Sequence, residues 1–141
     1  IEPGCVVGPF ARLRPGTHLH EDVRIGNFVE VKNATLMDGV KANHLSYIGD
    51  AQIGSGTNFS CGAITANYDG YNKFKTTIGS NVMVGSNVTL IAPMSVGDGA
   101  YIAAGSTLGK DVPPHALAVE RADQRHVDGW AMRKRDRETR K

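Results

Sequence analysis

Cysteine, aromatic side chains and long apolar runs are all scarce in this sequence. Its 141 residues include two cysteines, Cys5 and Cys61, too few for a disulfide framework or a cysteine-rich zinc site. A reducing, cytoplasmic location is therefore expected. No apolar stretch approaches the roughly 18 residues that span a membrane. Aromatic residues make up 6% of the chain and glycine occurs 17 times, which argues against a helical bundle or a coiled coil.

Positive charge is concentrated near the C-terminal end, although the formal net charge is only +2. Residues 1–120 contain 8 Lys and Arg against 10 Asp and Glu, whereas residues 121–141 contain 8 against 4. The simplest interpretation is a solvated basic tail. No recognised nucleic-acid-binding motif accompanies it, so the other interpretation is contact with an anionic small molecule or a neighbouring chain.

Apolar residues recur along the chain with a period of six. The interval shortens to five twice and is interrupted once. Sixteen of eighteen such positions hold Val, Ile, Leu or Phe, although these types account for only 32 of the 141 residues. The positions are Ile1, Val7, Leu13, Leu19, Ile25, Val31, Leu36, Ala42, Ile48, Ile53, Phe59, Thr65, Ile78, Val84, Leu90, Val96, Ile102 and Leu108. Fifteen of the 17 glycines occupy the second or fourth place of a unit, so glycine obeys the same register.

This hexapeptide period predicts an all-β parallel β-helix in which three units complete one coil. Eighteen units make about six coils, stacked at the ~4.8 Å spacing between strands. Known hexapeptide helices are left-handed, so the same hand is expected here. The β-helix is predicted over residues 1–113, with a loop, NYDGYNKFKTT (67–77), that projects from it. Residues 114–141 are predicted to form a tail that packs on a neighbouring subunit.

Residues three units apart lie above one another in such a helix, so the register predicts columns of side chains. One column places Asn27 below His44, and another places Arg14 directly beneath Lys32. Two cations on adjacent strands repel each other. They indicate either a site for an anion such as phosphate or two separately solvated basic residues, and the column alone favours neither.

His44 is the histidine that the columns bring closest to other candidate groups. A single histidine on such a face is more often structural than catalytic, but Tyr47, the two stacked cations and the loop are all expected on neighbouring surface. The small residues Cys61, Ser86 and Ala104 continue the column of His44. They predict a smooth groove of roughly 14 Å, long enough for an extended pantetheine arm, although small residues also simply ease turning.

Four segments carry a resemblance to a known family: GPFARLRPG (8–16), GNFVEVKNA (26–34), HLSYIGDA (44–51) and NYDGYNKFKTTIG (67–79). They resemble the acetyltransferase half of the bacterial bifunctional N-acetylglucosamine-1-phosphate uridyltransferase/glucosamine-1-phosphate acetyltransferase. The resemblance covers nearly the whole chain, through HALAVER (115–121) and the Gly129-Trp130 pair. The family's uridyltransferase domain has no counterpart in these residues and the opening coils are shortened. We therefore expect a fragment of the C-terminal domain.

The resemblance also implies roles for individual residues. His44 corresponds to the family's general base. The sugar-phosphate contacts correspond to Arg14, Lys32, Tyr47, Asn58 and Lys73. The acetyl-CoA contacts correspond to Cys61 (through its backbone), Asn67, Tyr68, Ser86, Ala104 and Arg121. The sequence departs from the family in the run Phe59-Ser60-Cys61-Gly62-Ala63, where the family has a smaller Ile-Gly-Ala-Gly-Thr-like run.

The implied reaction is acetyl transfer from acetyl-CoA to the 2-amino group of glucosamine 1-phosphate, for UDP-N-acetylglucosamine and cell-envelope synthesis. An imidazole accepts a proton near neutral pH, which suits His44 to this step. Asn67 or a backbone N–H near residue 61 is expected to stabilise the oxyanion, and no metal is required. The partners are the two substrates and two further copies of the chain in a homotrimer with shared sites.

Three other interpretations of the sequence can be compared with this one. A hexapeptide-fold carbonic anhydrase needs three histidines on zinc, but His18, His20, His44, His115 and His126 supply no fitting set of columns. Another hexapeptide acyltransferase, acting on a different amine or alcohol, is the enzymatic alternative. A purely structural β-helix is the non-enzymatic one, although it would not require the stacked cations or the loop.

Overall fold

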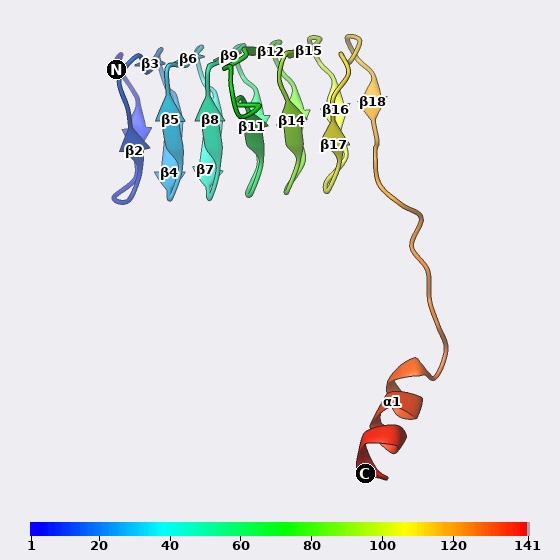
Figure 1. Cartoon of the computed structure of the whole chain (residues 1–141). Helices are drawn as coiled ribbons and strands as arrows, with labels where there is room; N and C mark the ends of the chain where they lie inside the picture. Colours follow the sequence, from blue (N-terminus) through cyan, green and yellow to red (C-terminus); the bar gives the residue numbers. More distant parts are fainter. Residues whose placement is uncertain (141) are drawn as a thin grey trace.

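Three parallel sheets form the faces of a triangular solenoid in the computed structural model, which describes residues 1–140 (Figure 1). Lys141, the last residue of the predicted tail, lies outside the described residues. Sheet A contains β1 (Val6–Val7), β4 (Arg24–Asn27), β7 (Lys41–His44), β10 (Asn58–Phe59), β13 (Met83–Val84), β16 (Tyr101–Ile102) and β18 (Leu117–Ala118). Sheet B contains β2 (Arg12–Leu13), β5 (Glu30–Lys32), β8 (Tyr47–Gly49), β11 (Ile64–Ala66), β14 (Thr89–Ile91) and β17 (Thr107–Leu108). Sheet C contains β3 (His18–Leu19), β6 (Thr35–Leu36), β9 (Ala51–Ile53), β12 (Thr76–Ile78) and β15 (Met94–Val96).

The strand order confirms the predicted parallel β-helix of about six coils. Through β17, each paired strand lies beside the strand three places later in the chain, as three units per coil require. The helix also continues slightly beyond residue 113, because β18 pairs with β16.

The core is the column of inward-pointing first residues. These side chains are at most 8% exposed from Leu19 to Leu108, whereas Ile1 and Val7 are exposed at the first coil. The polar exception, Thr65, is 1% exposed and its hydroxyl is fully used. It accepts a hydrogen bond from the Gly49 N–H (2.8 Å) and donates one to the Gly49 carbonyl (3.0 Å). A buried hydroxyl is tolerated here because the preceding coil supplies both partners.

Left-handed backbone conformations turn the chain at the corners of the triangle. Gly62 has φ 75°, a conformation that costs glycine little. Phe28 (φ 59°) and Leu45 (φ 46°) occupy equivalent corner positions, where their bulky side chains make the same conformation costly. The Phe10 and Phe28 rings stack with centroids 5.4 Å apart, and Phe10, Phe28 and Leu45 are all about 60% exposed. We call these three residues the apolar ridge.

The inserted loop lies between β11 and β12 and is shorter than its predicted span of 67–77. Strand β12 begins at Thr76, which is buried and pairs with Ala51. An antiparallel bridge between Tyr68 and Lys73 forms the neck of the loop. Asp69 closes its tip, because its Oδ1 accepts hydrogen bonds from the backbone N–H groups of residues 71 and 72 at 2.8 and 2.6 Å.

The C-terminal segment leaves the solenoid after β18 and ends in helix α1 (Trp130–Thr139), as Figure 1 shows. No residue of α1 is buried, and Trp130 and Met132 are 55% and 64% exposed. In the described residues, no helix has the length and apolar character needed to cross a membrane.

Candidate active site

His44 ends strand β7 at the corner between sheets A and B, and its side chain is exposed. Its pairing with Asn27 confirms the predicted column. Ser46 Oγ donates a hydrogen bond to the His44 carbonyl oxygen at 2.8 Å, which fixes the backbone of the corner. Within residues 1–140 the imidazole itself has no hydrogen-bond partner, so both ring nitrogens are available to a ligand.

A hollow of about 290 Å³ lies beside His44, which we call the His44 hollow. It is lined by Asn43, His44, Asn58, Phe59, Ser60, Cys61 and Ser86. The column continues upward, because the Asn87 N–H donates to the Cys61 carbonyl at 2.9 Å and the Gly105 N–H donates to the Ser86 carbonyl at 2.8 Å. The predicted order of His44, Cys61, Ser86 and Ala104 along one edge is thus present.

The predicted stacking of Arg14 and Lys32 is also present, since the residues just before them, Leu13 and Val31, are paired. Each cation, however, has a carboxylate of its own. Arg14 Nη1 lies 2.8 Å from Glu30 Oε1, and Lys32 Nζ lies 3.2 Å from Asp50 Oδ2. The carboxylates offset the repulsion that the column alone predicts, and they hold both cations over sheet B.

Asp50 is the centre of the most extensive polar network of the site. Its carboxylate accepts hydrogen bonds from Lys32 Nζ, from Asn33 Nδ2 at 2.7 Å and from Asn67 Nδ2 at 2.5 Å. Partial burial raises the pKa of the Asp50 carboxyl, but the hydrogen bonds from Asn33, Asn67 and Lys32 outweigh it and leave the pKa below its usual value. The ionised carboxylate therefore ties the start of the loop to sheet B.

Gly49 is required beside this network. A Cβ at this position would lie 2.7 Å from Asn67 Nδ2 and would also meet the phenol of Tyr47. Tyr47 Oη is itself 3.4 Å from Asn67 Nδ2. The absence of a side chain at residue 49 therefore lets Tyr47 and Asn67 lie against the backbone and against each other.

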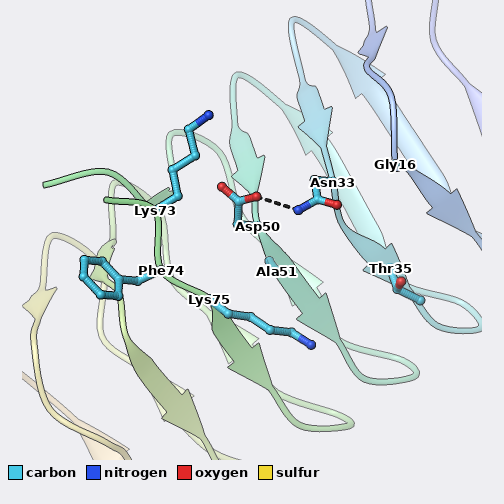
Figure 2. Close-up of a pocket in the computed structure, with 8 residues that line it drawn as sticks. All are labelled: Gly16, Asn33, Thr35, Asp50, Ala51, Lys73, Phe74 and Lys75. Carbon is cyan, nitrogen blue, oxygen red and sulfur yellow. Dashed lines mark hydrogen bonds between the residues drawn. The ribbon is translucent and has the colours of Figure 1, made fainter. Parts of the chain in front are cut away.

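A second hollow, of about 480 Å³, lies at the corner between sheets B and C, and we call it the Lys73 hollow. It is lined by Gly16, Asn33, Thr35, Asp50, Ala51, Lys73, Phe74 and Lys75. Figure 2 shows Asn33 and Asp50 facing each other across neighbouring strands, with Lys73 and Lys75 extending from the end of the loop. Sheet B thus separates Lys73 of a chain from His44 of the same chain.

The other predicted residues fall into three places. Asn58 lines the His44 hollow and donates to Ser60 Oγ at 2.9 Å. Tyr68 is 59% exposed at the neck of the loop. Arg121 Nη1 donates to the Ala104 carbonyl at 2.7 Å, so the first basic residue of the tail lies at the far end of the groove.

Sequence reasoning missed the residues that position the cations, namely Glu30, Asn33 and Asp50. The register did contain a signal for Glu30, which pairs with Arg12, two residues before Arg14. Asp50 lies in the segment HLSYIGDA, whose resemblance to the family implies no role for this carboxylate. An exposed imidazole at one corner, fixed cations on the adjacent face and a groove of small residues suit proton transfer from an amine on an anionic substrate.

Known proteins match this chain both through a family model and through close sequence relatives. Residues 75–110 match the family described as bacterial transferase hexapeptide (six repeats). The chain is 58% identical over 127 residues to bifunctional protein GlmU of Stutzerimonas stutzeri, covering 90% of this chain and 28% of that protein. It is 59% identical over 124 residues to bifunctional protein GlmU of Staphylococcus haemolyticus, covering 88% and 28% respectively. The chain spans less than a third of the length of these relatives.

Solved structures with a similar fold are more distant in sequence. PerB of Caulobacter crescentus superimposes with a TM-score of 0.75 at 19% identity, covering 82% of this chain and 54% of that one. The acetyltransferase domain of PglB from Neisseria gonorrhoeae gives 0.73 at 21% identity, covering 80% and 53%. These two structures support the fold alone. The close sequence relatives confirm the resemblance drawn from the four segments, and the chain belongs to the GlmU family as its C-terminal hexapeptide-repeat domain.

Proposed function

We propose that this domain transfers the acetyl group of acetyl-CoA to the 2-amino group of glucosamine 1-phosphate. The observation that carries the proposal is the imidazole of His44, which has no hydrogen-bond partner in residues 1–140. It shares one hollow with Cys61 and Ser86 at the edge of a face bearing fixed cations. The GlmU relatives, 56–59% identical over about nine-tenths of the chain, support the same assignment. The product, N-acetylglucosamine 1-phosphate, would serve UDP-N-acetylglucosamine and cell-envelope synthesis.

The acceptor's phosphate is assigned to Arg14, Lys32 and Lys73. The first two are already oriented by Glu30 and Asp50, so little side-chain freedom is lost when the phosphate binds. Tyr47, which lies beside Asn67, and Asn58, which lines the His44 hollow, are assigned to the sugar hydroxyls. Binding the phosphate in this way holds the amine near the thioester and makes the reaction effectively intramolecular.

The free 2-amino group forms a bond to the thioester carbonyl carbon, and His44 accepts the one proton that this nitrogen loses as the tetrahedral intermediate forms. The tetrahedral intermediate collapses when the C–S bond breaks, and the proton held by His44 passes to the departing thiolate of CoA. Asn67 is a poor oxyanion donor because its amide group is engaged by Asp50 and Tyr47. The Cys61 N–H is the better candidate, since the backbone hydrogen bonds of the described residues do not use it.

Acetyl-CoA is assigned to the groove that runs from Cys61 past Ser86 and Ala104 to Arg121. Asn67 and Tyr68 are assigned to its acyl end as residues of the neighbouring chain's loop. PerB was solved with CoA and GDP-perosamine, and the PglB domain was also solved with acetyl coenzyme A, so the fold accommodates such a cosubstrate in other proteins. Arg121 lies at the far end, where a cation can meet the phosphates of CoA.

We further propose that three chains form a closed ring in which each site takes His44 from one chain and the loop from the next. Three observations support this. Lys73 and His44 of one chain line different hollows. The apolar ridge is exposed directly beside His44. The tail helix buries none of its residues on its own chain. In a closed threefold ring, each of these surfaces contacts a neighbouring copy of the same chain.

Mixing two inactive variants tests the shared site. One carries His44→Ala and the other carries Asn67→Ala with Lys73→Ala, and the two are unfolded together and reassembled. Because an intact site needs an unmodified His44 from one chain and an unmodified loop from the next, equal mixing restores roughly a quarter of the sites. Activity at background after mixing, or a monomer by light scattering, would contradict the shared site.

Release of the CoA thiol tests the reaction itself. The rate is measured with glucosamine 1-phosphate, with glucosamine and with no acceptor. Strong stimulation by glucosamine 1-phosphate alone supports the proposal, since only that acceptor offers a phosphate to Lys32. Equal stimulation by glucosamine would favour another hexapeptide acyltransferase, and no release with any acceptor would favour a purely structural β-helix.

A further inference from the structure

A cluster of two imidazoles and one carboxylate lies on the outer surface of sheet C. None of its three residues lines either hollow, although His18 pairs with Thr35 at the edge of the Lys73 hollow. His18 Nε2 lies 2.6 Å from Glu2 Oε1, and His20 Nδ1 lies 3.3 Å from the same oxygen. The possible ligand atoms of the three residues all lie within 4.8 Å of one another. In residues 1–140, this is the one group of three or more His, Cys, Asp or Glu residues with that property.

The β-helix brings these three side chains together without strain. Successive residues of a strand point to opposite faces, so His18 and His20 share the outer face while Leu19 between them is buried. The Glu2 N–H donates to the Leu19 carbonyl at 2.9 Å, which places Glu2 in the neighbouring coil beside His20. The N–H groups of His18 and His20 donate, at 2.9 Å each, to carbonyls of the coil on the other side. The backbone under all three side chains is therefore fixed.

The chemistry of the cluster is that of a transition-metal site. Imidazole nitrogen combined with a carboxylate oxygen is a ligand set that suits Zn²⁺ and its neighbours in the first row. The two rings stack with centroids 4.3 Å apart, and one nitrogen of each ring already lies within 3.3 Å of the same Glu2 oxygen. Asp38 Oδ1 lies 4.0 Å from His20 Nδ1 and is within reach as a fourth ligand.

We propose that Glu2, His18 and His20 bind one divalent transition-metal ion, such as Zn²⁺, with Asp38 or water as the fourth ligand. The ion joins the first coil to the second, because Glu2 belongs to one and both histidines belong to the other. It has no part in acetyl transfer, since His44 lies on sheet A at a different corner. The alternative is an ordinary ion pair between Glu2 and a protonated His18, and it requires no metal.

Calorimetric titration of the whole chain with ZnCl₂, under reducing conditions, distinguishes these two states. The expected result is one Zn²⁺ per chain, with an affinity that falls by at least about 10–100-fold in a His18→Ala/His20→Ala variant. His126→Ala is the matched control, because it removes an exposed imidazole from the tail and leaves the cluster unchanged. His18 is exposed and His20 is half-buried, and neither belongs to the apolar core, so circular dichroism is expected to show the double variant folded.

Thermal unfolding gives a second readout. Zn²⁺ is expected to raise the melting temperature of the wild type and of His126→Ala but not of the double variant, because a ligand that binds the folded state stabilises it. Three outcomes overturn the proposal: no binding to the wild type at millimolar Zn²⁺, unchanged binding by the double variant, or equal weakening by His126→Ala. Acetyl transfer by the double variant is expected to match the wild type, so this test is independent of the proposed function.

Discussion

The His44 hollow and the Lys73 hollow, on either side of sheet B, differ in how firmly their side chains are held. Among the described residues, neither the imidazole of His44 nor the thiol of Cys61 has a hydrogen-bond partner. At the opposite corner, Asp50 accepts hydrogen bonds from Lys32, Asn33 and Asn67. The side chains beside His44 are not held by hydrogen bonds, whereas those around Asp50 are held without any ligand. We call the first the open corner and the second the braced corner.

This difference matches what the two corners are proposed to do. A general base exchanges a proton with the substrate, so a permanent partner on its ring would compete with the reaction. A phosphate-binding surface gains from cations that are already oriented, because less conformational entropy is lost on binding. The comparison therefore predicts that changes at the open corner affect turnover, whereas changes at the braced corner affect stability first.

The largest effect is expected from His44→Ala. Loss of a general base lowers kcat by about 10²–10⁴-fold, and the exposed side chain contributes little to folding. Steady-state acetyl transfer measures kcat, and circular dichroism measures whether the variant is folded. His18→Ala, which removes an exposed histidine from sheet C, is the control and should leave kcat unchanged. Near-normal turnover by folded His44→Ala would reduce His44 to a structural residue.

Asp50→Asn should act mainly on stability. It removes the charge that three donors share and leaves Lys32 without its ion-pair partner, so the free energy of unfolding should fall by about 2 kcal/mol. Urea unfolding at matched protein concentration measures this. Asp38→Asn, an exposed carboxylate on sheet C, is expected to change it by less than about 0.5 kcal/mol. Equal losses in the two variants would show that the braced corner has no special role.

The stability that Asp50 contributes should depend on pH. Its pKa is lower in the folded chain than its ordinary value of 3.8, so the ionised form is favoured by folding. The contribution is complete above the unfolded pKa and is lost as pH falls through the lowered folded pKa. The gap in unfolding free energy between wild type and Asp50→Asn should therefore narrow from about pH 6 to about pH 3. A gap that stays constant over this range would exclude Asp50 as the titrating group.

The smallest effect is expected from Cys61→Ser. Direct attack by the amine needs no acyl-enzyme, so the thiol is dispensable and kcat should stay close to the wild-type value. Initial-rate plots with both substrates varied should intersect. Parallel lines, together with an acetylated Cys61 found by mass spectrometry, would replace direct transfer by a covalent mechanism.

The columns of the site were predictable from the sequence because the hexapeptide period alone sets which residues are stacked. Asn27 beside His44 and Arg14 beside Lys32 both follow from counting units. Counting hexapeptide units does not show which neighbouring residue a long side chain contacts. Arg14 turns to Glu30 and Lys32 to Asp50, so the cations are paired rather than bare. Rotamer choice at a corner depends on packing that a period does not encode.

The hexapeptide period does not predict two other features of the structure. Helix α1 buries no residue, so it has no apolar stripe from which to predict it. Thr76 and Thr77 fall within the predicted loop because neither is a large apolar residue. In the structure, both pair within sheet C. Register of the neighbouring strands, rather than the composition of these two threonines, decides where β12 begins.

The inserted loop has a consequence for how the chain folds. Paired residues in successive coils are sixteen to eighteen apart in sequence, as for Arg24 and Lys41, but twenty-five apart across the insertion, as for Asn58 and Met83. A solenoid whose contacts are all between neighbours can grow one coil at a time. Since the entropy of ring closure rises only with the logarithm of its length, the insertion adds about 0.3 kcal/mol to closing that coil. The loop can therefore be inserted in the middle of the β-helix with little effect on how fast the later coils form.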